Sequence, residues 1–226
     1  MDLGDGGLRS LRQDFGMRLD HVSYAVPASH LADEVQRIGA TVGGIFRDGG
    51  RHPQFGTRNF VLPLAGGMYI EVVATLDHPA ADRMPFGQAV KRRAELGGGW
   101  MAWVLAVEDI APVEQRLGRP ALQGVRHRPD GVDLSWKQLG IKDLLEDPQT
   151  PFFVQWLSDA AEHPSSGANG MPRITRLEVG GDAGHVSEWL GVSVDSIAGV
   201  EIDFVDDEPG LVAVHLDTRL GTVRLD

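Results

Sequence analysis

One order of elements recurs along the chain, and this repeat limits the possible fold more than any other feature. Each copy reads as a strand, a helix and three further strands, with glycines and other turn residues between them. Such a unit forms a small sheet whose helix covers one face. The other face of each sheet must therefore curve around another module, a ligand, or both.

The first copy is expected over residues 17–76. Its opening strand, 19–26, turns His21 to the face opposite Val22, because side chains alternate along a strand. A helix that Ser29 caps and Gly39 ends follows this strand. The remaining strands of this copy are expected at 41–46, 57–64 and 67–74.

The second copy is expected over residues 100–164, after a connector at 77–99 that contains a helix over 88–96. It opens with a strand at 100–107 and continues with a helix that starts after Asp109 and ends at Gly118. Its further strands are expected at 122–126, 132–137 and 152–157.

A degenerate third copy is expected over residues 165–226. It begins with a strand at 174–180, followed by a short helix that Gly191 ends. Three strands complete it, at 200–205, 211–216 and 222–225.

Charge and composition exclude several classes of function. The chain has 21 Lys and Arg against 32 Asp and Glu, a formal net charge of −11. This balance argues against a nucleic-acid partner, since nucleic-acid binders usually carry a basic patch. The absence of cysteine removes disulfides, thiol nucleophiles and thiolate metal sites.

No stretch of the sequence indicates a membrane segment or a leader. No run of about 18 apolar residues occurs, so we expect no membrane contact. Residues 1–16 lack the apolar core of a signal peptide and predict a loose N-terminal extension. We therefore expect a cytoplasmic protein.

Several segments resemble the glyoxalase-like branch of the vicinal-oxygen-chelate superfamily, which is also called the glyoxalase/bleomycin resistance/dioxygenase superfamily. They are LDHVSYAV, GGRHPQFGTRNFVL, MYIEVVA, RHRPDGVDLSW and PFFVQW, spread over residues 19–164. The resemblance implies an α+β fold of tandem βαβββ modules, whose curved mixed sheets form a cup for a small molecule. It implies a lyase, isomerase or dioxygenase acting on an oxygen-rich metabolite, or a binding protein without catalysis.

The resemblance also implies a place for one divalent metal, on the first and last strands of each module. In the first module these positions match His21 and Glu71; in the second they match Ala102 and Gln155. His21, Glu71 and Gln155 could hold Fe, Mn, Ni or Zn. Ala102 cannot bind a metal, and this gap favours a metal-free cup in which His21 and Glu71 form hydrogen bonds.

In the third copy the matching positions are Arg176 and Arg224, whose charges would repel a metal ion. We therefore expect this copy to be a structural or dimerisation module, which leaves a homodimer open.

Polar side chains gather in the segment 49–59. His52, which we expect at the rim of the cup, and Glu71 are the candidates for proton transfer. Arg51, Arg58 and Asn59 have donors that suit a carboxylate or carbonyl oxygen of a substrate. The alternative is a shaped turn in which these side chains satisfy loop carbonyls.

Three more residues are candidates for substrate binding. Arg126 flanks a Pro-Asp-Gly turn, so it either faces an anionic ligand or belongs to an ordinary turn. Trp100 and Phe153 are expected on the faces of Ala102 and Gln155, where they would line an apolar pocket. Trp103 and Trp156 should pack beneath helices or between sheets, and the other histidines, His163 and His215 among them, should lie at the surface or cap helices.

The strand at 57–64 allows a test of which side chains line the cup. We assign its apolar residues and Asn59 to the helix-packed face, which leaves Arg58 in the cup. Arg58→Ala should then weaken an anionic ligand by about 1.5–3 kcal/mol, while Asn59→Ala lowers stability and spares affinity. Ligand titration and denaturant unfolding of both variants measure this; equal affinity losses with intact stability would contradict the assignment.

Overall fold

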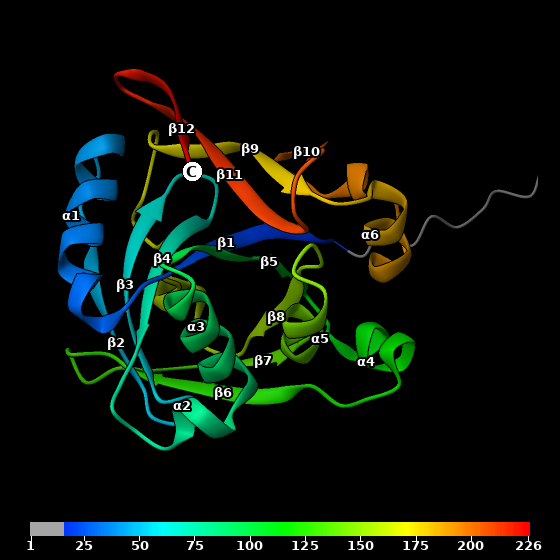
Figure 1. The fold of residues 1–226 in the computed structure, drawn as a ribbon, viewed down its shortest axis with the longest axis horizontal. Coiled ribbons are helices and arrows are strands. Elements are labelled where there is room, and N and C mark those ends of the chain that lie inside the picture. The colour runs from blue at the N-terminus through cyan, green and yellow to red at the C-terminus, as the bar shows by residue number, and fades with distance from the viewer. Residues whose placement is uncertain (1–15) are drawn as a thin grey trace, which may run out of the picture.

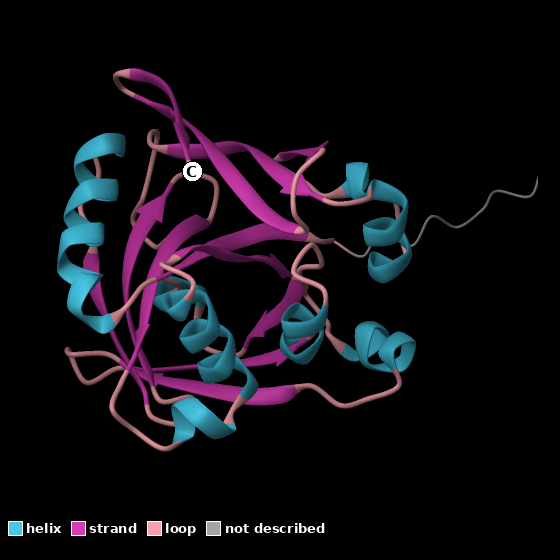
Figure 2. Ribbon diagram, in the orientation of Figure 1, coloured by secondary structure: helices cyan, strands magenta, loops and turns pink. Residues whose placement is uncertain are grey.

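Eight strands from the first two modules join edge to edge into a closed barrel (Figures 1 and 2). The computed structural model describes residues 16–226, so the expected extension at 1–16 lies outside them apart from Gly16. The first module supplies β1 (Arg18–Ala25), β2 (Arg47–His52), β3 (Thr57–Leu64) and β4 (Met68–Thr75). The second supplies β5 (Gly99–Ala106), β6 (Leu122–His127), β7 (Asp133–Leu139) and β8 (Phe152–Trp156).

The two modules have the same pairing, which explains how they close into one barrel. In each, the first strand runs parallel to the last and the other neighbours are antiparallel. One seam is the long antiparallel pair β1–β5, and the other is β2–β6, which pair at Arg51 and His127. The predicted α+β fold of tandem βαβββ modules with curved mixed sheets is confirmed.

Helices cover the barrel from outside and enter one end of it (Figure 2). They are α1 (Leu31–Val42), α2 (Ala80–Arg83), α3 (Pro85–Glu95), α4 (Ala111–Leu117), α5 (Ile141–Glu146) and α6 (Ala183–Leu190). Short 3-10 turns occur at Ala28–His30, Ala160–Glu162 and Val194–Ser196. Within residues 16–226, no helix has the length and apolar character needed to cross a membrane.

Two apolar cores lie on opposite sides of the barrel wall. The outer core packs α1 against β3 and β4 through Ile38, Leu62 and Leu64. The inner core holds Phe86 and Val90 of α3 against the inward side chains of the barrel. The helix of the predicted connector is therefore part of the core, because its apolar face enters the barrel instead of crossing its surface.

The C-terminal segment forms a separate sheet on the outside of the barrel (Figure 1). It contains β9 (Arg173–Gly180), β10 (Glu201–Val205), β11 (Gly210–Thr218) and β12 (Gly221–Leu225), in the order β10-β9-β11-β12. Its elements follow each other as the sequence predicts. Its first strand, however, pairs in parallel with the next strand and not with the last, unlike the two barrel modules.

One helix ends later in the sequence than predicted, and the strand that follows it therefore also begins later. Helix α1 continues through Gly39 and ends at Gly43, whose φ of 68° suits the C-terminal cap. A Cβ at Gly39 would lie 3.0 Å from the carbonyl oxygen of Gly44, so this glycine allows the segment after the helix to pack closely against it and does not end the helix. The strand expected at 41–46 consequently begins only at Arg47. Helix α5 was not predicted.

The β2–β6 seam depends on Gly50. A Cβ there would lie 2.0 Å from the carbonyl oxygen of His127, and φ is 102°. Gly50→Ala should lower the free energy of unfolding by about 2–4 kcal/mol, because backbone strain and a clash combine.

Gly43→Ala is the matched control. Its φ is also positive, but no atom lies within 4 Å of the added Cβ, so the loss should be only about 1 kcal/mol. Urea unfolding of both variants checks this difference. Equal losses would mean that the seam tolerates a side chain at position 50.

Candidate active site

The interior of the barrel contains a small cavity with charged and aromatic walls. His21 pairs with Tyr69 and Ser23 with Glu71 across the parallel strands β1 and β4, so all four side chains turn inward. His21 and Glu71 thus line one cavity, as the alternation along their strands predicts; their chemical roles stay predictions. The lining residues are His21, His52, Phe55, Tyr69, Glu71, Phe86, Arg126, Trp136, Gln138, Phe152, Val154 and Trp156.

Glu71 is held as a carboxylate by two short hydrogen bonds. Ser23 Oγ donates to one carboxylate oxygen and Asn59 Nδ2 to the other, each at 2.6 Å. Burial would raise the pKa of Glu71, but His21, His52 and these two donors outweigh it and lower the pKa. Glu71 is therefore a fixed negative charge at neutral pH.

His21 is oriented by a buried aspartate. Its Nδ1 lies 2.9 Å from Asp20 Oδ2, and its ring stacks on Tyr69 with the centroids 4.4 Å apart. His163 Nε2 and Trp156 Nε1 also bind Asp20, at 3.1 and 3.2 Å. Burial raises the pKa of Asp20, but the hydrogen bonds from the two histidines bring it well below its usual range. Because Nδ1 is engaged, Nε2 is the ring nitrogen of His21 available to a ligand.

Sequence reasoning missed Asp20 and His163. A β-bulge leaves Asp20 without a partner in β5, between the pairs Leu19–Leu105 and His21–Val104. This extra residue places the Asp20 carboxylate where His163 and Trp156 reach it. His163 comes from the segment after β8 and is largely buried, not a surface residue. No sequence signal marks such a bulge, and His163 has no motif around it.

His52 lies inside the cavity and not at the predicted rim. It is 3% exposed, and its Nδ1 lies 2.9 Å from Thr57 Oγ1. The rings of Phe55, Phe86 and Trp136 surround it. This burial lowers the pKa of His52 to about 3, with Glu71 opposing the shift. His52 is therefore a neutral imidazole at neutral pH.

Arg126 is a buried cation with no carboxylate partner within residues 16–226. It is 3% exposed, and its Nε has no hydrogen bond. It lies on β6 beside Trp136, whose indole crosses Gly124; a Cβ at Gly124 would lie 2.4 Å from Trp136 Cε2. A buried charge is stable only with a partner, so the cavity offers a ready place for an anion.

Two predicted residues of β8 and one of β5 lie outside the cavity. The inward residues of β8 are Phe152, Val154 and Trp156. The first two pair with Val104 and Ala106, which point inward from β5. Gln155 and Phe153 consequently point outward. Gln155 instead accepts from Ile110 N at 3.3 Å and donates to the carbonyl oxygen of Glu108 at 2.9 Å, which fixes the start of α4.

A second β-bulge accounts for Trp100. The register passes from Ser23–Ala102 to Tyr24–Trp100, which leaves Met101 unpaired. Trp100 therefore points away from Ala102 and out of the barrel, where its Nε1 donates to the carbonyl oxygen of Leu225 at 3.2 Å. The predicted apolar pocket of Trp100 and Phe153 does not form.

The predicted faces of Arg58 and Asn59 are reversed. Arg58 shares the outer face with Phe60 and Leu62, since alternate residues share a face. It pairs with Asp48 at 3.2 Å. Asn59 points inward to Glu71, so the expected effect of Arg58→Ala on a ligand loses its basis. Arg51 is exposed on the outer side of β2.

The donor set does not fit a resident divalent metal. Within residues 16–226, no three or more His, Asp or Glu side chains are arranged to hold a metal ion. Both oxygens of Glu71 already accept short hydrogen bonds, Ala102 has no donor atom, and Gln155 points away. Arg176 and Arg224 pair with Asp203 and Glu178 on the C-terminal sheet.

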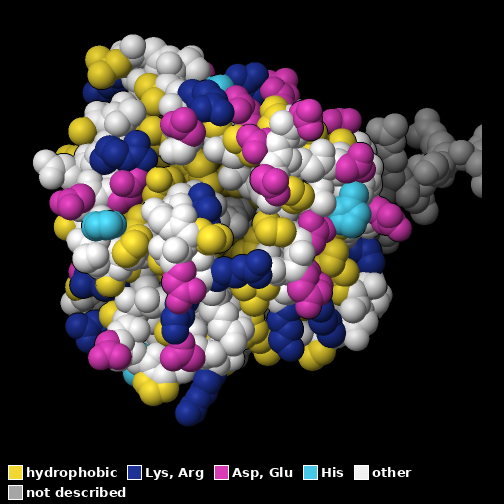
Figure 3. All heavy atoms as spheres, in the orientation of Figure 1, with side chains coloured by type: hydrophobic (Ala, Val, Ile, Leu, Met, Phe, Trp, Pro, Cys, Tyr) yellow, Lys and Arg dark blue, Asp and Glu magenta, His cyan; other side chains and the backbone are white. Residues whose placement is uncertain are grey.

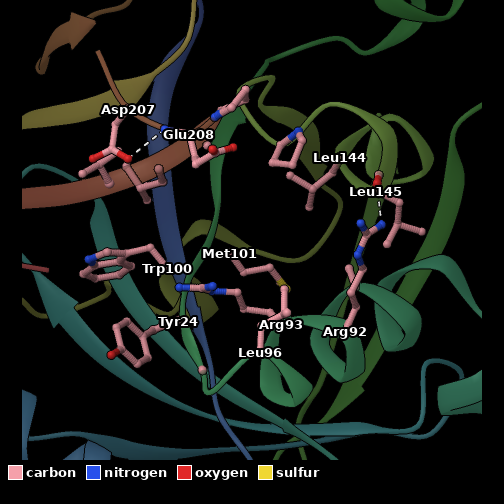
Figure 4. A pocket seen from close by; sticks show the side chains of 18 of the residues that line it. Tyr24, Arg92, Arg93, Leu96, Trp100, Met101, Leu144, Leu145, Asp207 and Glu208 are labelled. Carbon is pink, nitrogen blue, oxygen red and sulfur yellow. Dashed lines mark hydrogen bonds between the residues drawn. The ribbon is translucent and has the colours of Figure 1, made fainter. Parts of the chain in front are cut away.

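A larger cleft of about 1250 Å³ lies outside the barrel, beside α3 and the loop before β11. Figure 3 shows a hollow on this face with hydrophobic and basic side chains around it. In Figure 4, Arg92 and Arg93 extend from α3 and Asp207 and Glu208 lie across from them. None of the buried charged groups described above lines this cleft, so the inner cavity is the candidate active site.

Comparisons with known proteins agree with this fold. Residues 19–192 match the family model described as a glyoxalase-like domain. A hypothetical protein from Staphylococcus aureus has the same fold, with 18% identity and a TM-score of 0.57 over 92% of this chain and 85% of that one. No curated protein matches the sequence.

Two epimerase structures match with lower scores. Methylmalonyl-CoA epimerase from Mycobacterium tuberculosis is 16% identical, with a TM-score of 0.41 over 62% of this chain and 86% of that one. The Streptomyces coelicolor enzyme in complex with 2-nitronate-propionyl-CoA is 18% identical, with a TM-score of 0.42 over 62% and 92%.

The buried state of His52 predicts a pH dependence of stability. Above pH 6.5, the ordinary pKa of histidine, His52 is neutral in both states and its contribution is fully present. As the pH falls from 6.5 toward 3, only the unfolded chain takes up the proton, so stability is lost. Between pH 7.5 and 5.5 the wild type should lose about 1.4 kcal/mol more than His52→Gln. Urea unfolding at both pH values measures this; parallel losses would show that the folded protein protonates His52 as readily as the unfolded chain does.

Proposed function

Because the chain belongs to the glyoxalase-like domain family, we propose that it is an enzyme that binds a small, oxygen-rich anion in the barrel and moves a proton on it. The observation that carries this proposal is Arg126, a buried guanidinium without a partner carboxylate in the described residues. A substrate carboxylate would supply the missing acceptors through two parallel hydrogen bonds.

The arrangement of His21 supports a proton transfer. Asp20 holds Nδ1 at 2.9 Å and stays ionised, so it stabilises the imidazolium that forms when Nε2 takes a proton. His21 is the residue that removes a proton from the carbon next to the substrate's carbonyl or carboxylate. Glu71 keeps its charge and stabilises the protonated ring from across the cavity.

His52 completes the site as a neutral group. Its pKa of about 3 makes it a poor base at neutral pH, but a neutral imidazole can donate a hydrogen bond to the substrate oxygen on which charge develops. Removal of a proton next to a carbonyl begins many isomerisations and eliminations. The proposed reaction class is therefore an isomerisation or an elimination.

A second candidate is a binding protein without catalysis. The aromatic wall around His52 and the cation at Arg126 would hold an anion without any chemistry. The two candidates share the ligand and differ in whether His21 exchanges a proton with it.

Pyruvate, a small 2-oxo acid, tests both. The wild type should bind it and exchange its methyl protons with D₂O, followed by NMR. Arg126→Leu should weaken binding by about 1.5–3 kcal/mol, while Arg58→Leu, a change on the outer face, leaves it unchanged.

His21→Gln separates enzyme from binding protein. It should bind pyruvate but lose about 10²–10⁴-fold in exchange rate, the usual contribution of a general base. Binding without exchange in the wild type would favour the binding protein. Arg126→Leu binding as tightly as the wild type would overturn the proposed function.

A further inference from the structure

A second pocket of about 700 Å³ lies next to the active-site cavity. Three side chains line both hollows: Phe55, Phe86 and Gln138. The pocket and the cavity are therefore neighbours with a common wall. The other residues of its wall include Arg119, Leu122 and Lys142.

The pocket leads from solvent toward the cavity. At its outer end Leu122 is 45% exposed and Lys142 is exposed. At its inner end Phe55 and Phe86 are 2% and 7% exposed. A ligand that enters at Leu122 meets the wall of the active-site cavity at the bottom of the pocket.

The two hollows differ in chemistry. No Asp or Glu side chain lines the pocket. Apart from two cations, Arg119 and Lys142, its wall consists of apolar side chains, one amide side chain and one glycine. Arg119 is paired with Asp143, which leaves little demand for an anion here. A hydrocarbon group suits these walls, since it is removed from water without losing hydrogen bonds.

Gln138 lies where the two hollows meet. Its Oε1 accepts from Trp136 Nε1 at 2.7 Å, which leaves the Nε2 donors for another acceptor. A ligand that passes this point would offer them an oxygen between its charged and its apolar part. Leu122 and Arg126 share the inner face of β6, and four residues of strand span about 13 Å.

We propose that the substrate is an amphipathic 2-oxo or 2-hydroxy acid, with its carboxylate at Arg126, its second oxygen near Gln138 and a medium-length alkyl or phenyl tail in this pocket. The proposal rests on the proposed function, which supplies the anionic head group. The tail pocket determines which acids of that class bind.

Calorimetric titration with pyruvate and 2-oxooctanoate tests the tail. The two probes share a head group, and 2-oxooctanoate adds an alkyl chain. The wild type should bind 2-oxooctanoate on the order of 100-fold more tightly than pyruvate, because several methylene groups leave water. Leu122→Asp should remove roughly tenfold or more of this gain and leave pyruvate unaffected. Leu122→Trp, which fills the pocket without adding charge, should give the same loss.

Leu157→Asp is the matched control. Leu157 is 46% exposed, close to the 45% of Leu122, and lines neither hollow. It should bind both acids as the wild type does. An equal loss of 2-oxooctanoate binding in Leu157→Asp would overturn the proposal.

The outcomes also separate this proposal from the proposed function. If both acids bind with affinities within threefold of each other and Arg126→Leu weakens both, the tail pocket is wrong and the anion site stands. If neither acid binds the wild type, or Arg126→Leu leaves both unchanged, the anion site fails and the tail proposal fails with it.

Discussion

The antiparallel pairing of β1 with β5 turns two modules into one barrel, and the candidate site exists only because of that closure. A closed sheet has a finite interior, and every second residue of each strand must fill it. Charged side chains that an open sheet would expose to water are then forced together. Glu71 and Arg126 come from different modules and line the same cavity for this reason.

The charged side chains inside the barrel differ in how many hydrogen-bond partners the protein gives them. Glu71 and Asp20 each have at least two hydrogen-bond donors, so both anions are compensated by the protein. Arg126 lacks such hydrogen bonds: its Nε has no partner among the described residues, and Glu71 acts on it only through its charge. In the proposed function, this difference selects for negatively charged ligands, because an anion completes the hydrogen bonding of the open cation.

The succession of strands along the two barrel modules, the first helix of each module and the inward direction of His21 and Glu71 follow from local patterns, and the sequence predicts them. The predicted faces of Trp100 and Gln155 were wrong. The face on which a side chain lies depends on the alternation of side chains along the whole strand. A single bulge, such as the one at Met101, reverses the phase without leaving a mark in the residue pattern. Arg58 was assigned to the cup against the alternation that its own strand imposes. The approach of His163 to Asp20 joins residues far apart in the chain, and no local rule predicts it.

Helix α3 makes the segment between the two modules part of the inner core of the barrel. Phe86, Ala89 and Val90 fill one end of the barrel, although they belong to neither repeat. The two modules therefore cannot be regarded as independent units joined by a spacer. A chain divided on either side of α3 would leave an apolar opening in one half and an unprotected apolar helix on the other, which is the kind of surface that drives aggregation.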